Sequence, residues 1–123
     1  MSRRMVWGPT FEEMLHPGKI DPTIREKALA AKEGDPLNEI NLYNITWKRP
    51  DGKPCYIVLP KELTGVDANI IALYGRDFPT SSHKVGATYT VTMEKQLLGE
   101  ITPGEHTLVY PSTGNYGIGG AWV

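Results

Sequence analysis

The stretch TSSHKVGATY, residues 80–89, places a lysine where small hydroxylic residues give way to a helix-forming run. Helix is predicted from about Lys84 to Leu98, ending at Gly99, because glycine commonly terminates helices. Lys84 would then lie at the positive end of a helix dipole, which disfavours a further positive charge, and burial would add to this effect. Lys84 is therefore a candidate for a neutral amine that attacks an aldehyde. The alternative is an ordinary lysine that extends into solvent.

Composition places the chain among ordinary globular proteins and excludes several classes of partner. The 123 residues suffice for one domain, and the formal net charge of -1 gives no electrostatic reason to expect nucleic acid or an anionic membrane surface. We therefore expect neither partner. A membrane span is not expected either, since no apolar run approaches the roughly 18 residues that it needs. Cys55 is the single cysteine, and we expect it to be buried as an apolar residue. A single cysteine forms no internal disulfide, which fits a reducing compartment, so we expect a cytoplasmic protein. His16 and His106 lack metal-ligand spacing, and we predict no metal site.

Residues 1–65 are predicted to form an N-terminal helical segment and a β-hairpin. Thr10 and Glu13 form a capping box, and Asp21-Pro22 opens a helix over residues 23–32. Residues 42–48 alternate between apolar and polar side chains, which predicts a strand. Residues 49–53 have the composition of a turn, and residues 55–59 would be the partner strand of the hairpin.

Residues 66–123 are predicted to form an α/β unit. Residues 69–74 are a short apolar run, typical of a strand covered on both faces, and residues 107–110 are a second such run. The helix over residues 84–98 lies between them, and another would begin at Ile118. The order strand, helix, strand, helix predicts a parallel β-α-β-α unit with right-handed crossovers.

The last predicted helix is short for an independent element. It ends at Trp122 and Val123 without a capping residue or a polar tail, so Trp122 would be exposed and the second strand would lack a neighbour. We therefore expect residues 66–123 to be an incomplete domain, either the front part of a longer protein or one that a partner chain completes.

A second loop, residues 111–117, precedes this last helix. Glycines allow close approach of the backbone to a ligand, and free N–H groups at a helix start bind anions such as carboxylate or phosphate. Ligands of parallel α/β units bind at the carboxyl ends of the strands, so this loop and Lys84 are expected to face one cleft. The alternative is a plain capping turn. The glycine spacing fits no nucleotide-binding motif.

Together the two segments resemble the fold-type II pyridoxal-phosphate enzymes: cysteine synthases, threonine synthases, serine and threonine dehydratases, and the tryptophan synthase β chain. Ser81-Ser82-His83-Lys84-Val85-Gly86-Ala87 is similar to their lysine segment, and Ser112-Thr113-Gly114-Asn115-Tyr116-Gly117 to their S/T-G-N-T-G loop. The resemblance covers about residues 66–123. Tyr116 and Val85 depart from the residues common in the family. The family's glycine-rich phosphate cup and the residue facing the pyridine nitrogen do not occur in these 123 residues.

The resemblance implies a role for each matching residue. Lys84 would form a Schiff base with pyridoxal 5'-phosphate and move the substrate's α-proton. Asn115 would hydrogen-bond the ring hydroxyl of the cofactor, and His83 could contact its phosphate. The substrate carboxylate would be held, largely through backbone N–H groups, by Ser112, Thr113, Gly114, Asn115 and Tyr116.

The first hypothesis is therefore a pyridoxal-phosphate enzyme, or its N-terminal part, that acts on a small amino acid by β-elimination or β-replacement. The 123-residue chain alone is expected to be inactive. A second hypothesis is a non-catalytic fragment or subunit that needs a further chain to complete the cofactor site, and a third is an α/β interaction module whose loops serve as caps. We expect a homo-oligomer, most simply a dimer, or completion by another chain. The amino acid and the reaction subtype stay open.

Overall fold

The first two helices begin at the side-chain caps predicted for them. In the computed structural model, which describes residues 8–123, α1 (Phe11–Leu15) starts at Thr10, whose hydroxyl accepts a hydrogen bond from the Glu13 N–H while the Glu13 carboxylate accepts one from the Thr10 N–H. The short 3₁₀ helix η1 (Pro17–Lys19) leads to α2 (Pro22–Gly34), which the Asp21 carboxylate caps. Both predicted helix starts are confirmed. The prediction for Trp7, a core or interface role, lies outside the described residues.

The predicted strand over residues 42–48 is wrong. Residues Glu39–Asn44 form the 3₁₀ helix η2, which packs against α2. Two buried asparagines explain the difference, because the Asn44 side-chain amide donates to the Ala28 carbonyl at 2.6 Å and the Asn41 amide donates to the Asp35 carbonyl at 2.8 Å. These bonds attach η2 to the middle and to the end of α2, and a strand would withdraw both side chains from them.

A two-stranded antiparallel ribbon replaces the predicted hairpin. Strand β1 (Tyr56–Leu59) pairs with β2 (Ile70–Leu73), with Tyr56 opposite Leu73 and Leu59 opposite Ile70. The short helix α3 (Lys61–Thr64) joins the strands and ends at Gly65 in the left-handed conformation. The predicted turn over residues 49–53 is present, but it closes only the single bridge between Lys48 and Pro54.

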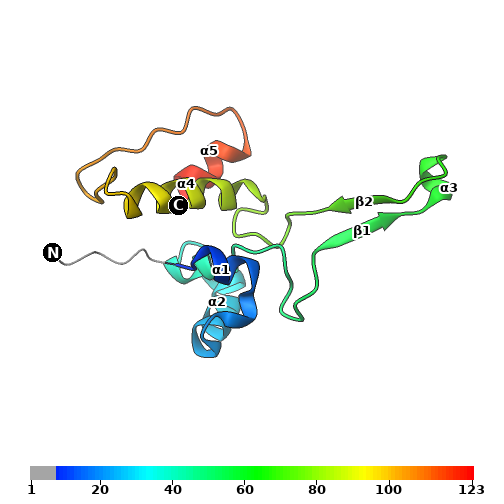
Figure 1. Cartoon of the computed structure of the whole chain (residues 1–123), viewed down its shortest axis with the longest axis horizontal. Coiled ribbons are helices and arrows are strands. Elements are labelled where there is room, and N and C mark those ends of the chain that lie inside the picture. Colours follow the sequence, from blue (N-terminus) through cyan, green and yellow to red (C-terminus); the bar gives the residue numbers. More distant parts are fainter. Residues whose placement is uncertain (1–7) are drawn as a thin grey trace.

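The ribbon is exposed, so the prediction that the 69–74 strand is covered on both faces is wrong. It projects from the helical part of the molecule as an arm, drawn in green at the right of Figure 1. Ile71 and Leu73 are each 60% exposed, and Val58 is 55% exposed. The two strands of the sheet run antiparallel, and the described residues contain no parallel β-α-β-α unit. At the coarse level the protein is a small mixed domain of helices and strands, compatible with the α/β class.

The long helix α4 (Lys84–Leu97) matches its prediction closely, whereas the strand predicted over residues 107–110 is absent. Those residues belong to an extended connection between α4 and α5 (Asn115–Trp122). Tyr110 explains the lack of a strand: its hydroxyl is 2.5 Å from the Thr92 Oγ1 and its ring lies against Gly120. The connection is thus tied to helices on both sides and has no strand to pair with. Helix α5 begins three residues before the predicted Ile118.

The buried core joins both halves of the sequence. Ile45 packs with Phe78, Val85, Tyr89 and Met93, and the half-buried Trp122 lies against this cluster. Trp122 also donates its indole N–H to the Pro36 carbonyl at 3.1 Å, so the expectation of an exposed Trp122 is wrong. The Tyr89 hydroxyl donates to the Pro9 carbonyl at 2.7 Å, across 80 positions of the chain.

Across residues 8–123, every helix is too short or too polar to cross a lipid bilayer.

Candidate functional site

The turn before Lys84 is held tightly in place. Ser81 adopts a φ of 54°, which is uncommon for a residue other than glycine. Gly75 lies so close to the turn that a Cβ there would sit 2.7 Å from the His83 backbone nitrogen. The buried Ser82 accepts a hydrogen bond from the Lys84 N–H on its hydroxyl at 3.3 Å. Several constraints therefore fix where α4 begins.

Lys84 is the first residue of α4, as predicted, but it is exposed rather than buried. Its side chain has no carboxylate partner among residues 8–123, whereas Lys61 pairs with Asp67 and Lys95 with Glu100. The position at a helix start is confirmed. The burial that would further favour a neutral amine is not found.

His83 lies on the wall of an apolar pocket. Its ring is tilted by 31° against Trp47, with centroids 5.4 Å apart, and Trp47 in turn meets Phe78 edge-on. The pocket has a volume of about 440 Å³, and its other walls come from α1, from the segment around Ile45 and from the first turns of α4. Trp47 and His83 therefore belong to a common apolar surface.

The loop predicted to hold a substrate carboxylate forms the start of α5. The Ser112 hydroxyl accepts a hydrogen bond from the Gly114 N–H at 3.2 Å, and Gly114 is the N-cap residue. Asn115 is the first residue of the helix and is exposed, as are residues 112–114. The N–H groups of Asn115 and Tyr116 lie where a helix offers no internal acceptor and can bind an anion, whereas the Gly117 N–H donates to the Gly114 carbonyl at 3.0 Å. The Tyr116 ring is half-buried and packs against Tyr110, with centroids 5.8 Å apart.

Helix α5 packs directly on α4 and against Tyr110, and a glycine permits each of these close approaches. A Cβ on Gly119 would lie 2.9 Å from the Val85 Cα, and one on Gly120 would overlap the Tyr110 ring. The long connection returns along α4, so that α5 begins at the end of the pair where α4 also begins (Figure 1). The two predicted segments thus come to the same end of adjacent helices, although no parallel sheet supports them among the residues described.

The pockets lie elsewhere. Besides the apolar pocket, there is one of about 180 Å³ between α2 and the turn after Lys48, and one of about 270 Å³ beside Tyr43. Neither Lys84 nor residues 112–116 line any of these three. None of these three pockets is therefore the cleft that was expected between the two loops.

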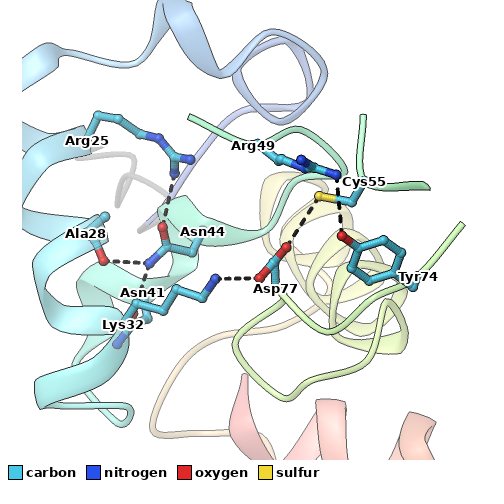
Figure 2. A network of polar contacts seen from close by, with 9 residues as sticks. All are labelled: Arg25, Ala28, Lys32, Asn41, Asn44, Arg49, Cys55, Tyr74 and Asp77. Carbon is cyan, nitrogen blue, oxygen red and sulfur yellow. Dashed lines mark hydrogen bonds and ion pairs between the residues drawn. The ribbon is translucent and has the colours of Figure 1, made fainter. Parts of the chain in front are cut away.

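A polar network that the sequence did not reveal borders the second pocket (Figure 2). The Arg25 guanidinium donates to the Tyr43 carbonyl at 2.7 Å and to the Asn44 Oδ1 at 3.1 Å. The Lys32 ammonium pairs with the Asp77 carboxylate at 3.3 Å. Only the adjacent pair Lys48 and Arg49 could have suggested a basic cluster, because Arg25, Lys32 and Asp77 come from distant parts of the chain.

Cys55 lies next to this network and is 2% exposed, which confirms the predicted burial. Burial raises the pKa of the Cys55 thiol; the hydrogen bond from Arg49 opposes this, and Asp77, whose Oδ2 lies 3.5 Å from the sulfur, raises the pKa further. A thiol with a raised pKa is a weak nucleophile at neutral pH. Cys55 is therefore a packing residue of this region.

Comparison with known protein families, with curated proteins and with solved structures finds no match. Among the described residues, no three His, Cys, Asp or Glu side chains gather where they could hold a metal ion.

Proposed function

We propose that the protein is a pyridoxal-phosphate-dependent enzyme that acts on a small amino acid by β-elimination or β-replacement. The observation that carries this proposal is the common end of α4 and α5, which puts the beginning of the Lys84 helix beside the beginning of the Asn115 helix. The resemblance of both segments to fold-type II enzymes supplies the chemical interpretation.

The residues present fit the aldehyde group of the cofactor and the carboxylate of the substrate. Lys84 offers an accessible amine that no described carboxylate neutralises, as an aldehyde-binding lysine requires. The exposed start of α5 offers N–H donors for a carboxylate, in the favourable direction of the helix dipole. Pyridoxal phosphate, when bound, supplies an electron sink for charge that develops at the substrate's α-carbon.

The chain's own groups then divide the remaining work. The Lys84 Nζ would hold the cofactor through its aldehyde group and would move the proton at the substrate's α-carbon. Backbone N–H groups of Asn115 and Tyr116, with the Thr113 hydroxyl, would fix the carboxylate and so orient the bond that breaks, while the Ser112 hydroxyl holds the Gly114 N–H and shapes the loop. The Asn115 amide is free to contact the cofactor's ring hydroxyl. His83, whose exposed ring lies against Trp47, is the proposed contact of the phosphate.

Trapping the amine–aldehyde bond tests the proposal without depending on turnover. The full chain is incubated with pyridoxal phosphate, reduced with borohydride and digested, and the labelled peptide is identified by mass spectrometry. We expect the label on Lys84. Lys61 and Lys95 are internal controls, because carboxylates pair with both ammonium groups.

A variant and a second aldehyde serve as controls for this experiment. Lys84→Arg should abolish the main label and leave the far-ultraviolet circular dichroism unchanged, since the Lys84 side chain is exposed. Pyridoxal without its phosphate should label Lys84 less. A label spread evenly over the exposed lysines, or one unaffected by Lys84→Arg, would contradict the proposed role.

A further inference from the structure

The pocket between α2 and the turn after Lys48 carries an unusual concentration of positive charge. Its lining includes four cations and one carboxylate, in a pocket of about 180 Å³; these are Arg25, Lys32, Lys48, Arg49 and Asp77. The chain as a whole has a formal net charge of -1, so this excess is local. It arises because Arg25 and Lys32, two turns apart on one face of α2, lie opposite the segment before the ribbon (Figure 2).

Most of this charge is not neutralised within the protein. Lys32 pairs with Asp77, but none of the ion pairs among residues 8–123 involves Arg25, Lys48 or Arg49. The half-buried Arg25 guanidinium donates to two neutral oxygens, and Arg49 donates to the Tyr74 hydroxyl at 3.4 Å and hydrogen-bonds the Cys55 sulfur, so neither has a charged partner in these bonds. A half-buried cation such as Arg25 is stabilised by an anionic partner, and such a partner would come from outside the described chain.

The size and the kind of cation indicate what that partner is. Since one water occupies about 30 Å³ of liquid, a pocket of about 180 Å³ has room for a tetrahedral oxyanion and a few waters. Guanidinium groups bind such anions through two parallel N–H donors, and a dianion gains from several cations that converge on it. We propose that this pocket binds a phosphate dianion, either free or as the terminal group of a phosphate monoester.

This binding site goes beyond the function proposed above. Lys84 and residues 112–116 do not line the pocket, and phosphate binding here requires neither the aldehyde nor the amino-acid substrate. The two proposals therefore stand or fall separately.

The test measures phosphate binding to the full chain by isothermal titration calorimetry, at constant ionic strength with chloride as the competing anion. The variant is the double substitution Lys48→Gln/Arg49→Gln, which removes two cations with solvent-accessible side chains. We expect its phosphate affinity to fall by about tenfold or more, because charge-assisted hydrogen bonds are lost. Lys53→Gln is the matched control: Lys53 belongs to the same turn and is exposed, but it does not line the pocket. Its affinity should be unchanged.

Asp77→Asn provides a second, opposite readout. Removal of the carboxylate frees Lys32 and reduces repulsion of the anion, so phosphate should bind more tightly. Parallel titrations with inorganic phosphate and glycerol phosphate distinguish the two sources, since a monoester site binds the ester at least as tightly. The proposal is overturned if phosphate binds no better than chloride, or if Lys53→Gln weakens binding as much as the double variant does.

Discussion

Gly119 on α5 touches the backbone of Val85 on α4 so closely that a Cβ on Gly119 would lie 2.9 Å from the Val85 Cα and 3.0 Å from the Thr88 Oγ1. Val85 is fully buried and directly follows Lys84. The contact therefore fixes the position of α5 relative to the beginning of α4. Because the proposed carboxylate loop precedes α5, this glycine positions the candidate site.

Substitution of Gly119 by alanine should destabilise the protein. The added methyl group meets backbone atoms that cannot turn aside, and overpacking of this kind typically costs about 1–3 kcal/mol. Urea unfolding followed by circular dichroism measures the change. Gly34→Ala is the control, because Gly34 also lies in a helix but a Cβ there would have no neighbouring atom within 4 Å; it should be neutral or slightly stabilising. Equal effects of the two substitutions would show that the contact is loose.

Acid should weaken the link between α2 and the loop that contains Asp77. Burial opposes ionisation of Asp77, but the hydrogen bond and charge of Lys32, together with the Cys55 hydrogen bond and the Arg49 charge, outweigh it and lower the pKa of Asp77 below its usual range. A carboxyl whose pKa is lower in the folded state stabilises the fold above its unfolded pKa of about 3.9. That stabilisation is lost as the pH falls through the lower folded value.

Asp77→Asn should therefore lower the melting temperature at pH 7, by a small amount because the side chain is partly exposed. The difference from the unmodified protein should vanish in strong acid. Asp67→Asn is the control, since the Asp67 side chain is 91% exposed. If the melting temperatures of both variants converge on that of the unmodified protein over the same pH range, the pair of Lys32 and Asp77 adds no pH-dependent stability of its own.

Asn115→Ala should affect cofactor binding and not stability. The Asn115 side chain is exposed at the first position of α5, and the cap residue is its neighbour Gly114. We expect less pyridoxal phosphate trapped on Lys84 by reduction, with the melting temperature changed by no more than a degree or two, as for most surface substitutions. A large fall in the melting temperature with undiminished labelling would instead make Asn115 a structural residue.

The exposed ribbon should promote association of one copy of the protein with another. Val58 and Ile71 face each other across the two strands and are more than half exposed, and unpaired strand edges readily pair with another chain. Sedimentation velocity should show self-association that increases with protein concentration. The double substitution Val58→Glu/Ile71→Lys preserves an attractive cross-strand pair and should shift the protein toward monomer, whereas Glu26→Lys on α2 should not. A protein that is monomeric at every concentration would contradict this.

Local signals in the sequence predicted the helices well. Thr10 and Asp21 cap α1 and α2, as predicted, and Lys84 begins α4. These features depend on residues within one turn of each other, so the sequence contains all that is needed to find them. The loop of residues 112–116 likewise forms a helix start, where the Gly114 N–H donates to the Ser112 hydroxyl two residues earlier.

Strands were harder to predict because their partners are distant. The apolar alternation around Ile45 looks like a strand, but the Asn44 side chain bonds the Ala28 carbonyl, 16 residues earlier, and favours a 3₁₀ helix. The run at residues 107–110 has the composition of a strand, yet Tyr110 is drawn into the contact between α4 and α5. The basic pocket escaped prediction for the same reason, since Arg25 and Asp77 meet only in the folded chain.

The hydrogen bond from Tyr89 to the Pro9 carbonyl has a consequence for biosynthesis. While the ribosome is still adding residues before α4, Ile45 lacks its core partners Val85, Tyr89 and Met93, and the Pro9 carbonyl lacks its hydrogen-bond donor. The side of the N-terminal segment that packs on α4 therefore leaves the ribosome before it can be buried, although η2 is already available to α2. Closing a loop of this length carries an entropic penalty that slows folding. Collapse into the native core should thus wait until α4 has emerged, and nascent chains ending before it should be the ones that proteases cut and chaperones bind.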